Sequence, residues 1–107
     1  MFVIDTHPKF TTTVAVQLGD ATEPSTFQAT FVALPAEELK SFDTATEEGT
    51  EALLVRVIDT LDDLVDEEGK AVSYTVDLRD TLLGLPWVRQ PLVRAYFTEL
   101  ARARLGN

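Results

Sequence analysis

Apolar and polar residues alternate in two segments of the N-terminal third of the chain. In residues 10–18 and 26–34, apolar side chains recur at nearly every second position, mostly separated by threonine or glutamine. A period of two with many β-branched residues is typical of strands that bury one face. The polar segment 19–25 between them contains glycine and proline, which favours a turn. The pattern predicts an antiparallel hairpin whose buried face includes Phe10, Val14, Val16, Leu18, Phe27, Ala29, Phe31 and Ala33.

Two helices are expected to follow the hairpin. Pro35, followed closely by Glu37 and Glu38, favours a short helix over residues 35–42. The first N–H groups of a helix have no partner within it, so a proline there loses no hydrogen bond, and the helix dipole favours acids in the first turn. A second helix is expected from Glu51 to about Leu61, with Thr50 as its N-cap. Its apolar stripe at helical spacing consists of Leu54, Val55, Ile58 and Leu61.

The acidic segment 62–74 separates these helices from the rest of the chain. It predicts a loop or a small hairpin that turns at Glu68-Gly69. Ser73 or Thr75 can cap a third helix, which ends with Gly84 at its C′ position. The side chains expected to face inward from this third helix are Val76, Leu78, Leu82 and Leu83.

A fourth helix is expected to begin at Pro86. Pro91 lies within it and is expected to bend its first turns or to separate one turn from the main run. The elements together predict an α+β fold, in which an N-terminal antiparallel β-hairpin packs against a C-terminal bundle of about four short helices. A chain of 107 residues, 45% of them hydrophobic, suits a single domain over 1–107, with residues 1–9 expected to be mobile or loosely attached.

Charge is distributed unevenly along the chain. Residues 1–85 hold five Lys or Arg against seventeen Asp or Glu, whereas residues 86–107 hold four Arg against one Glu, within a net charge of -9. So acidic a protein is expected to bind no nucleic acid, because phosphate contacts need a basic surface. No apolar run has the length of a membrane span, and no cysteine is present to form a disulfide or a thiolate metal site.

The residues that could carry chemistry do not form a recognisable constellation. The acidic segment that starts at Asp62 fails the EF-hand register, because Leu64 stands at loop position 3 and Glu67 replaces the glycine of position 6. His7 is the single histidine, so neither a catalytic triad nor a histidine metal site can be assembled. Adjacent acids such as Glu37-Glu38 do not face each other on a helix. We expect no enzyme, no cofactor and no metal.

The fourth helix holds the residue types that anchor protein interfaces. Two of its three aromatic residues Trp87, Tyr96 and Phe97 are expected inside, and its arginines also have an ordinary role as complements of the helix dipole and surface ion pairs. The expected partner-binding residues are Trp87, Arg89, Arg94, Tyr96, Phe97 and Arg102.

Three segments in a fixed order resemble a known protein family. A hairpin ends in residues 27–35 and runs into a helix; an acid-acid-glycine turn follows at residues 65–69; and residues 83–97 carry Pro-x-Val-Arg and then Ala-Tyr-Phe. The order and spacing resemble the tail assembly chaperones of long-tailed, lambda-like bacteriophages (siphoviruses), over roughly residues 10–105.

The resemblance implies a non-catalytic role in tail morphogenesis. Such chaperones are made in the host bacterial cytoplasm, coat the long and aggregation-prone tape measure protein, help to recruit tail tube protein, and are absent from the mature virion. The resemblance carries over no functional residue. A homo-oligomer is expected, and the acidic body and basic terminal segment suggest head-to-tail pairing between copies.

Two other functions remain open at the level of sequence. A permanent tail or connector subunit would share the fold but remain in the virion. An acidic mimic of DNA that inhibits a host protein would suit the net charge of -9, although the acids cluster at expected helix starts and in one turn.

Overall fold

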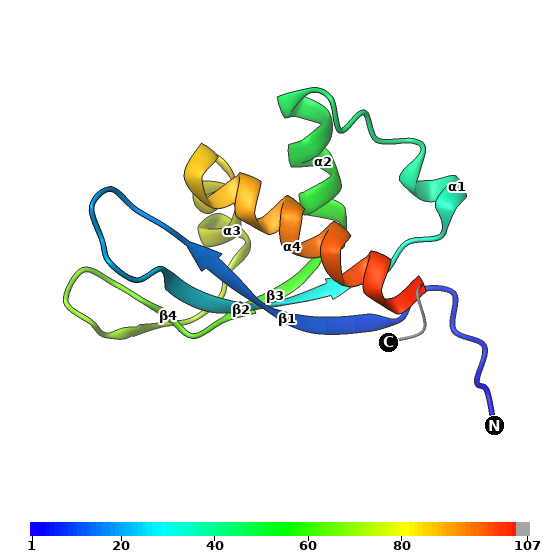
Figure 1. The fold of residues 1–107 in the computed structure, drawn as a ribbon, viewed down its shortest axis with the longest axis horizontal. Helices are drawn as coiled ribbons and strands as arrows, with labels where there is room; N and C mark the ends of the chain where they lie inside the picture. Colours follow the sequence, from blue (N-terminus) through cyan, green and yellow to red (C-terminus); the bar gives the residue numbers. More distant parts are fainter. Residues whose placement is uncertain (105–107) are drawn as a thin grey trace.

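The computed structural model describes residues 1–104, and the side chains of residues 1–102, as a β-sheet covered on one face by helices (Figure 1). The expected continuation of the last helix to Leu105, and the side chain of Arg104, lie outside this description. The predicted α+β class and the N-terminal hairpin followed by four helices are confirmed.

The hairpin forms as its alternation predicts. Strand β1 (Lys9–Val16) pairs antiparallel with β2 (Ser25–Val32), and Phe10 faces Phe31 across the ladder. Gly19 takes φ +54 in the connecting turn, a left-handed conformation that glycine adopts without steric cost. Most of the predicted inner positions are buried or half-buried, but Leu18 lies beyond the strand and is exposed.

The second helix is displaced from its predicted position. Helix α2 spans Glu47–Val57 and its N-cap is Thr46, whose side chain accepts a hydrogen bond from the Gly49 N–H at 2.9 Å, so the predicted Thr50 cap is wrong. The predicted stripe residue Val55 is exposed; the buried residues of α2 are Leu53, Leu54 and Val57.

Residues expected to continue that helix form a third strand instead. Strand β3 (Ile58–Asp62) pairs antiparallel with β2, giving the sheet order β1-β2-β3. A bulge between Thr30 and Phe31 pairs Ile58 with Phe31 and Leu61 with Ala29. The bulge thus lets residues three apart on β3 face the core together, and this spacing imitates a helix in the sequence.

The acidic segment 62–74, for which a loop or a small hairpin was expected, forms the small hairpin. Strand β4 (Leu64–Val65) pairs with β5 (Ala71–Val72), and Gly69 takes φ +82 in the turn. Thr75 caps helix α3 (Val76–Leu83) by accepting from the Leu78 N–H at 3.0 Å, which resolves the choice between Ser73 and Thr75.

Details of the shorter helices differ from expectation. Helix α1 (Ala36–Leu39) is a single turn, and Pro35 precedes it in an extended conformation rather than at its first position. Val76 is exposed rather than inward, and Gly84 closes α3 with an ordinary φ of -76° rather than a left-handed one. Helix α4 (Pro86–Arg104) continues through Pro91, so no separate turn forms.

Helix α4 lies across the sheet and closes the core. It packs on β1, while α2 packs on β2, and α2, α3 and α4 contact one another on the same side of the sheet (Figure 1). The largest fully buried side chains come from all of these layers and include Tyr96, Phe31, Leu53, Leu54, Leu61, Leu83 and Leu92. Within the described residues, no helix is long and apolar enough to cross a membrane.

Candidate partner-binding surface

Helix α4 has one buried and one exposed face. Its buried residues recur at helical spacing and are Val88, Arg89, Leu92 and Tyr96. The opposite face carries Trp87, Gln90, Arg94 and Phe97, spaced three, four and three residues apart, and all four are exposed. Trp87 is 51% and Phe97 37% exposed, although large aromatic side chains are mostly buried in folded proteins. We call these four residues the α4 stripe.

Tyr96 belongs to the core rather than to this surface. Its hydroxyl donates to the carbonyl oxygen of Val32 at 3.0 Å and accepts from the Leu34 N–H at 3.1 Å. Its ring contacts Phe10 and Phe31 with centroids 5.7 and 5.2 Å away. Burial raises the pKa of the Tyr96 hydroxyl, partly offset by the hydrogen bond from Leu34, so the hydroxyl stays a donor at neutral pH. The prediction that Tyr96 binds a partner is therefore wrong, because its side chain lies in the core.

Arg89 is also buried, at 6% exposure. Its guanidinium donates to the carbonyl oxygen of Leu83 at 2.9 Å, at the end of α3, and pairs with Glu47 at 3.3 Å, at the start of α2. The arginine thus joins three helices, and a carbonyl at a helix C-terminus is a favourable partner for a cation. The prediction that it lies on the interaction surface was wrong, because periodicity gave no sign of its two internal partners.

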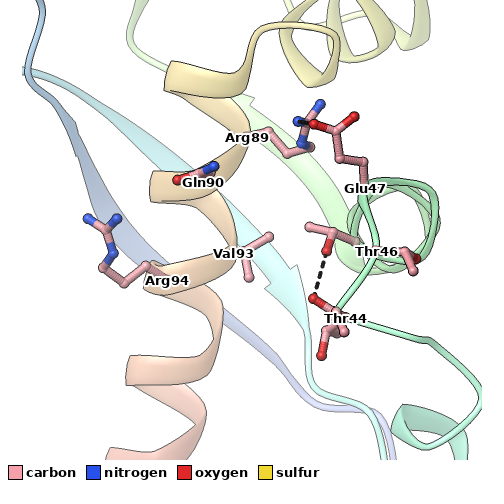
Figure 2. A pocket seen from close by; sticks show the side chains of 9 residues that line it. Thr44, Thr46, Glu47, Arg89, Gln90, Val93 and Arg94 are labelled. Carbon is pink, nitrogen blue, oxygen red and sulfur yellow. Dashed lines mark hydrogen bonds and ion pairs between the residues drawn. The ribbon is translucent and has the colours of Figure 1, made fainter.

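A depression borders the α4 stripe. It has a volume of about 370 Å³ and lies between α4 and the loop before α2, with Thr44, Thr46 and Thr50 on one wall. Figure 2 shows Arg89 and Val93 directed toward that loop, whereas Arg94 points to the other side of α4. Within residues 1–102, no ion pair involves Arg94, so its charge is available to an acidic group of a partner.

Arg102 lies near the other end of α4. It is exposed, and its guanidinium pairs with Glu99 at 2.9 Å, three residues earlier. It also lines a separate apolar groove of about 300 Å³ between the end of α4 and the start of β1. The six predicted contact residues therefore do not form one site: Trp87, Arg94 and Phe97 share the stripe, and the other three lie elsewhere.

Gln90 is the member of the stripe that the predicted set lacked. It stands three residues after Trp87 and four before Arg94. That spacing places it between them on the helix surface. The helical spacing of Gln90 from Trp87 and Arg94 could be read from the sequence, but glutamine is not a typical interface residue, so only the register of the helix identifies it.

A second polar cluster joins the N-terminal segment to the helices. The Glu38 carboxylate binds His7 Nε2 at 3.0 Å through one oxygen and Arg56 Nε at 2.7 Å through the other. The hydrogen bond from His7, followed by the contacts with Arg56, holds the pKa of Glu38 below its ordinary value of 4.5. The cluster fastens α1 to α2 and to the segment before β1. Ion-pair networks with a structural role shift pKa values in this way.

The described residues hold no group of three or more His, Cys, Asp or Glu that could bind a metal ion. The fold and its exposed residues define a small α+β protein that displays aromatic and basic side chains along one face of its longest helix. Comparisons of the chain with protein-family models, with curated proteins and with solved structures find no match.

Proposed function

We propose that this protein is a phage tail assembly chaperone, a non-catalytic protein that binds and solubilises the tape measure protein and helps to recruit tail tube protein. The observation that carries the proposal is the α4 stripe, in which Trp87 and Phe97 are exposed on either side of Arg94. Tryptophan and arginine are enriched among the residues that dominate binding energy at protein interfaces. The order of elements that resembles such chaperones supports the same function.

The α4 stripe suits a helical client. Trp87 and Phe97 lie ten positions apart, which corresponds to roughly 15 Å along a helix at 1.5 Å per residue. Two aromatic anchors at this distance can contact apolar side chains that lie about three turns apart on a partner helix. The depression beside Gln90 and Val93 offers room for one client side chain between the α4 stripe and the loop before α2.

The net charge of -9 supports a solubilising role. A chaperone that covers an apolar client contributes its own charge to the complex, and strong net charge keeps a protein in solution. The stripe itself holds one arginine and no acid, so it does not repel an acidic client locally.

Co-expression with the tape measure protein of the same phage tests the proposal. The wild-type chain is expected to raise the soluble fraction of the tape measure protein, and Trp87→Ala combined with Phe97→Ala is expected to remove most of that gain. Leu18→Ala combined with Val65→Ala is the matched control, because it removes exposed apolar side chains from hairpin regions outside α4. Circular dichroism of each variant checks that the fold is retained.

Three outcomes would count against the proposal. If the tape measure protein stays equally insoluble with and without this chain, the chaperone function is falsified. If the chain is found in purified virions, it is a permanent tail or connector subunit. Recovery of host DNA-binding proteins, without tail proteins, from a lysate would instead favour a DNA mimic.

A further inference from the structure

The first four residues expose apolar side chains to solvent. Met1, Phe2, Val3 and Ile4 are all highly exposed, and the least exposed of them, Val3, is 76% exposed. Four consecutive apolar residues without cover are unusual on a protein surface and indicate a contact with another molecule. We call this segment, residues 1–4, the N-terminal arm.

The residues that directly follow the N-terminal arm are held so that the arm points away from the rest of its own molecule. His7 binds Glu38 of α1 at 3.0 Å, and the His7 N–H donates to the Asp5 carboxylate at 3.0 Å, which fixes a bend directly after the arm. Figure 1 shows the N-terminus extending away from both the sheet and the helices.

An apolar groove lies at the same end of the molecule. Phe10, Ala33 and Leu100 line it, together with Lys9, Glu99 and Arg102. Its volume of about 300 Å³ is at the lower limit of ligand pockets, which suits one or two side chains rather than a cofactor. Phe10, Ala33 and Leu100 are half-buried, and Phe10 and Leu100 pack against the main core, so apolar surface of all three remains for this groove.

Arm and groove match in chemistry and position. Lys9 and Arg102 at the groove rim already pair with Asp59 and Glu99, so the match between arm and groove rests on apolar contact rather than on charge. Pro8 also lines the groove, so each molecule carries the root of its own arm beside its own groove. Two copies that meet through this end can therefore fill both grooves at once across a two-fold axis.

We propose that the N-terminal arm of one copy occupies the groove beside Phe10, Ala33 and Leu100 of a second copy, and that the exchange is reciprocal. The arm contributes apolar burial, and the bend that Asp5 and His7 form directly after it sets its direction. The four residues of the arm span at most about 14 Å when extended, so the two bodies must meet directly at their groove ends. This closed pair differs from open head-to-tail pairing through charge, and it does not depend on the function proposed above.

Sedimentation equilibrium on the full chain tests the exchange. The wild-type chain is expected to reach twice the mass of one chain, and to do so equally at low salt and at about 1 M NaCl, where charge interactions are screened within about 3 Å. Phe2→Ser combined with Ile4→Ser is expected to raise the dissociation constant by about tenfold or more, because each buried apolar side chain contributes strongly to association. A chain that stays monomeric at all concentrations, or that dissociates at high salt, would contradict the proposal.

Matched variants separate the arm from general hydrophobicity. Leu18→Ser combined with Val65→Ser removes exposed apolar side chains elsewhere and should leave the dissociation constant unchanged. Ala33→Leu fills the groove floor without adding charge and should weaken association as the arm variant does. Equal weakening by the control pair would show that the arm has no special role.

Cross-linking distinguishes a second copy from the chain's own arm and from a client. A photoreactive phenylalanine analogue at position 2 is expected to label peptides that contain Phe10 or Leu100. In a mixture of light and heavy isotope-labelled chains, these cross-links should join light to heavy peptides. Cross-links found only within one isotope label would show that the arm folds back onto its own groove, and cross-links outside the groove would show that it binds elsewhere; either result rejects the exchange.

Discussion

Tyr96 shows how much one hydroxyl contributes to the closure of this fold. It connects α4 to the end of β2 through two main-chain hydrogen bonds, to Val32 and Leu34, more than sixty positions earlier in the chain. A buried tyrosine needs a partner for its hydroxyl, and here the partners are backbone groups of the last residue of β2 and of a residue shortly after it. The residue therefore fixes both the depth and the register of α4 on the sheet.

Replacing this hydroxyl should destabilise the protein measurably. Tyr96→Phe keeps the ring but leaves the Leu34 N–H and the Val32 carbonyl without their buried partner, at an expected cost of about 1–3 kcal/mol. Urea unfolding followed by circular dichroism measures this cost. Tyr74→Phe is the control: its hydroxyl forms no hydrogen bond with any of the described residues, so a change below about 0.5 kcal/mol is expected. Equal losses in both variants would contradict the role given to Tyr96.

Gly49 in α2 and Gly84 at the C-terminus of α3 should respond oppositely to replacement by alanine. A Cβ at Gly49 would collide with the main-chain carbonyl of Asp43 and approach the Thr46 hydroxyl that caps α2. Gly49→Ala should therefore destabilise the protein by about 1–3 kcal/mol, even though alanine is the better helix former.

Gly84 is the matched control for this substitution. Its φ is -76°, and a Cβ there would meet the Thr81 carbonyl oxygen at an ordinary contact distance of 3.4 Å. Gly84→Ala should raise stability by about 0.4–1 kcal/mol, because alanine restricts the unfolded chain. Thermal unfolding midpoints of the two variants should move in opposite directions; a shared direction would show that steric space does not decide the outcome.

Among the secondary-structure elements, alternation and capping predicted most of the fold. The hairpin β1–β2, the small hairpin β4–β5, the Thr75 cap and the existence of four helices all follow from local patterns. Strand β3 could not be predicted in this way, because a bulge opposite Phe31 gives Ile58 and Leu61 a helical spacing. Pairing with β2 decided their conformation, and that pairing is a property of the tertiary structure.

The candidate surface was predictable only in part, for a related reason. Aromatic and arginine content indicated α4 as an interaction surface. Which of its residues are buried and which are exposed, however, depends on the hydrogen bonds and contacts that each makes with other elements. Tyr96 and Arg89 find theirs in β2, α2 and α3, whereas Trp87 and Phe97 remain exposed. One rather than two of the three aromatic residues is buried, because Trp87 and Phe97 lie on the face of α4 opposite the buried Tyr96.

The attachment of α1 should depend on pH. The pKa of Glu38 is held below 4.5 by His7 and Arg56, so its carboxylate stabilises the folded state fully above that pH, and the contribution is lost as the pH falls below it. At neutral pH, Glu38→Gln should lower the thermal midpoint, and the difference from the wild-type chain should shrink toward about pH 3. Circular dichroism across this range measures the difference; a constant difference would mean that the charge of Glu38 has no part in it.

Over the whole molecule, the separation of charge along the sequence is partly cancelled in space. The basic terminal helix does not present a continuous positive face, because Arg89 is buried against Glu47 and Arg102 pairs with Glu99. Arg94 is the described arginine of α4 that keeps its charge without such a partner within residues 1–102. The electrostatic attraction expected between the acidic body of one copy and the basic helix of another is therefore weaker than the sequence suggested.

Packing across the fold should make unfolding a single event. Helix α4 contacts the first strand, and the core includes side chains from β1, β2, β3, α2, α3 and α4. Small single domains with a shared core usually unfold in one transition. Trp87 fluorescence, which reports on α4, and far-UV circular dichroism should give the same midpoint in urea. Separate midpoints would show that α4 detaches before the sheet unfolds.

The reach of Tyr96 back to Val32 and Leu34 also has a consequence for biosynthesis. The hairpin is made before Tyr96, yet the Tyr96 ring stacks on Phe10 and its hydroxyl fastens β2. While the chain is still being translated, the apolar face of β1 and β2 has no helix to cover it. The protein therefore acquires its core after Tyr96 has been synthesised, and until then the nascent chain carries the same kind of uncovered apolar surface that folding later removes.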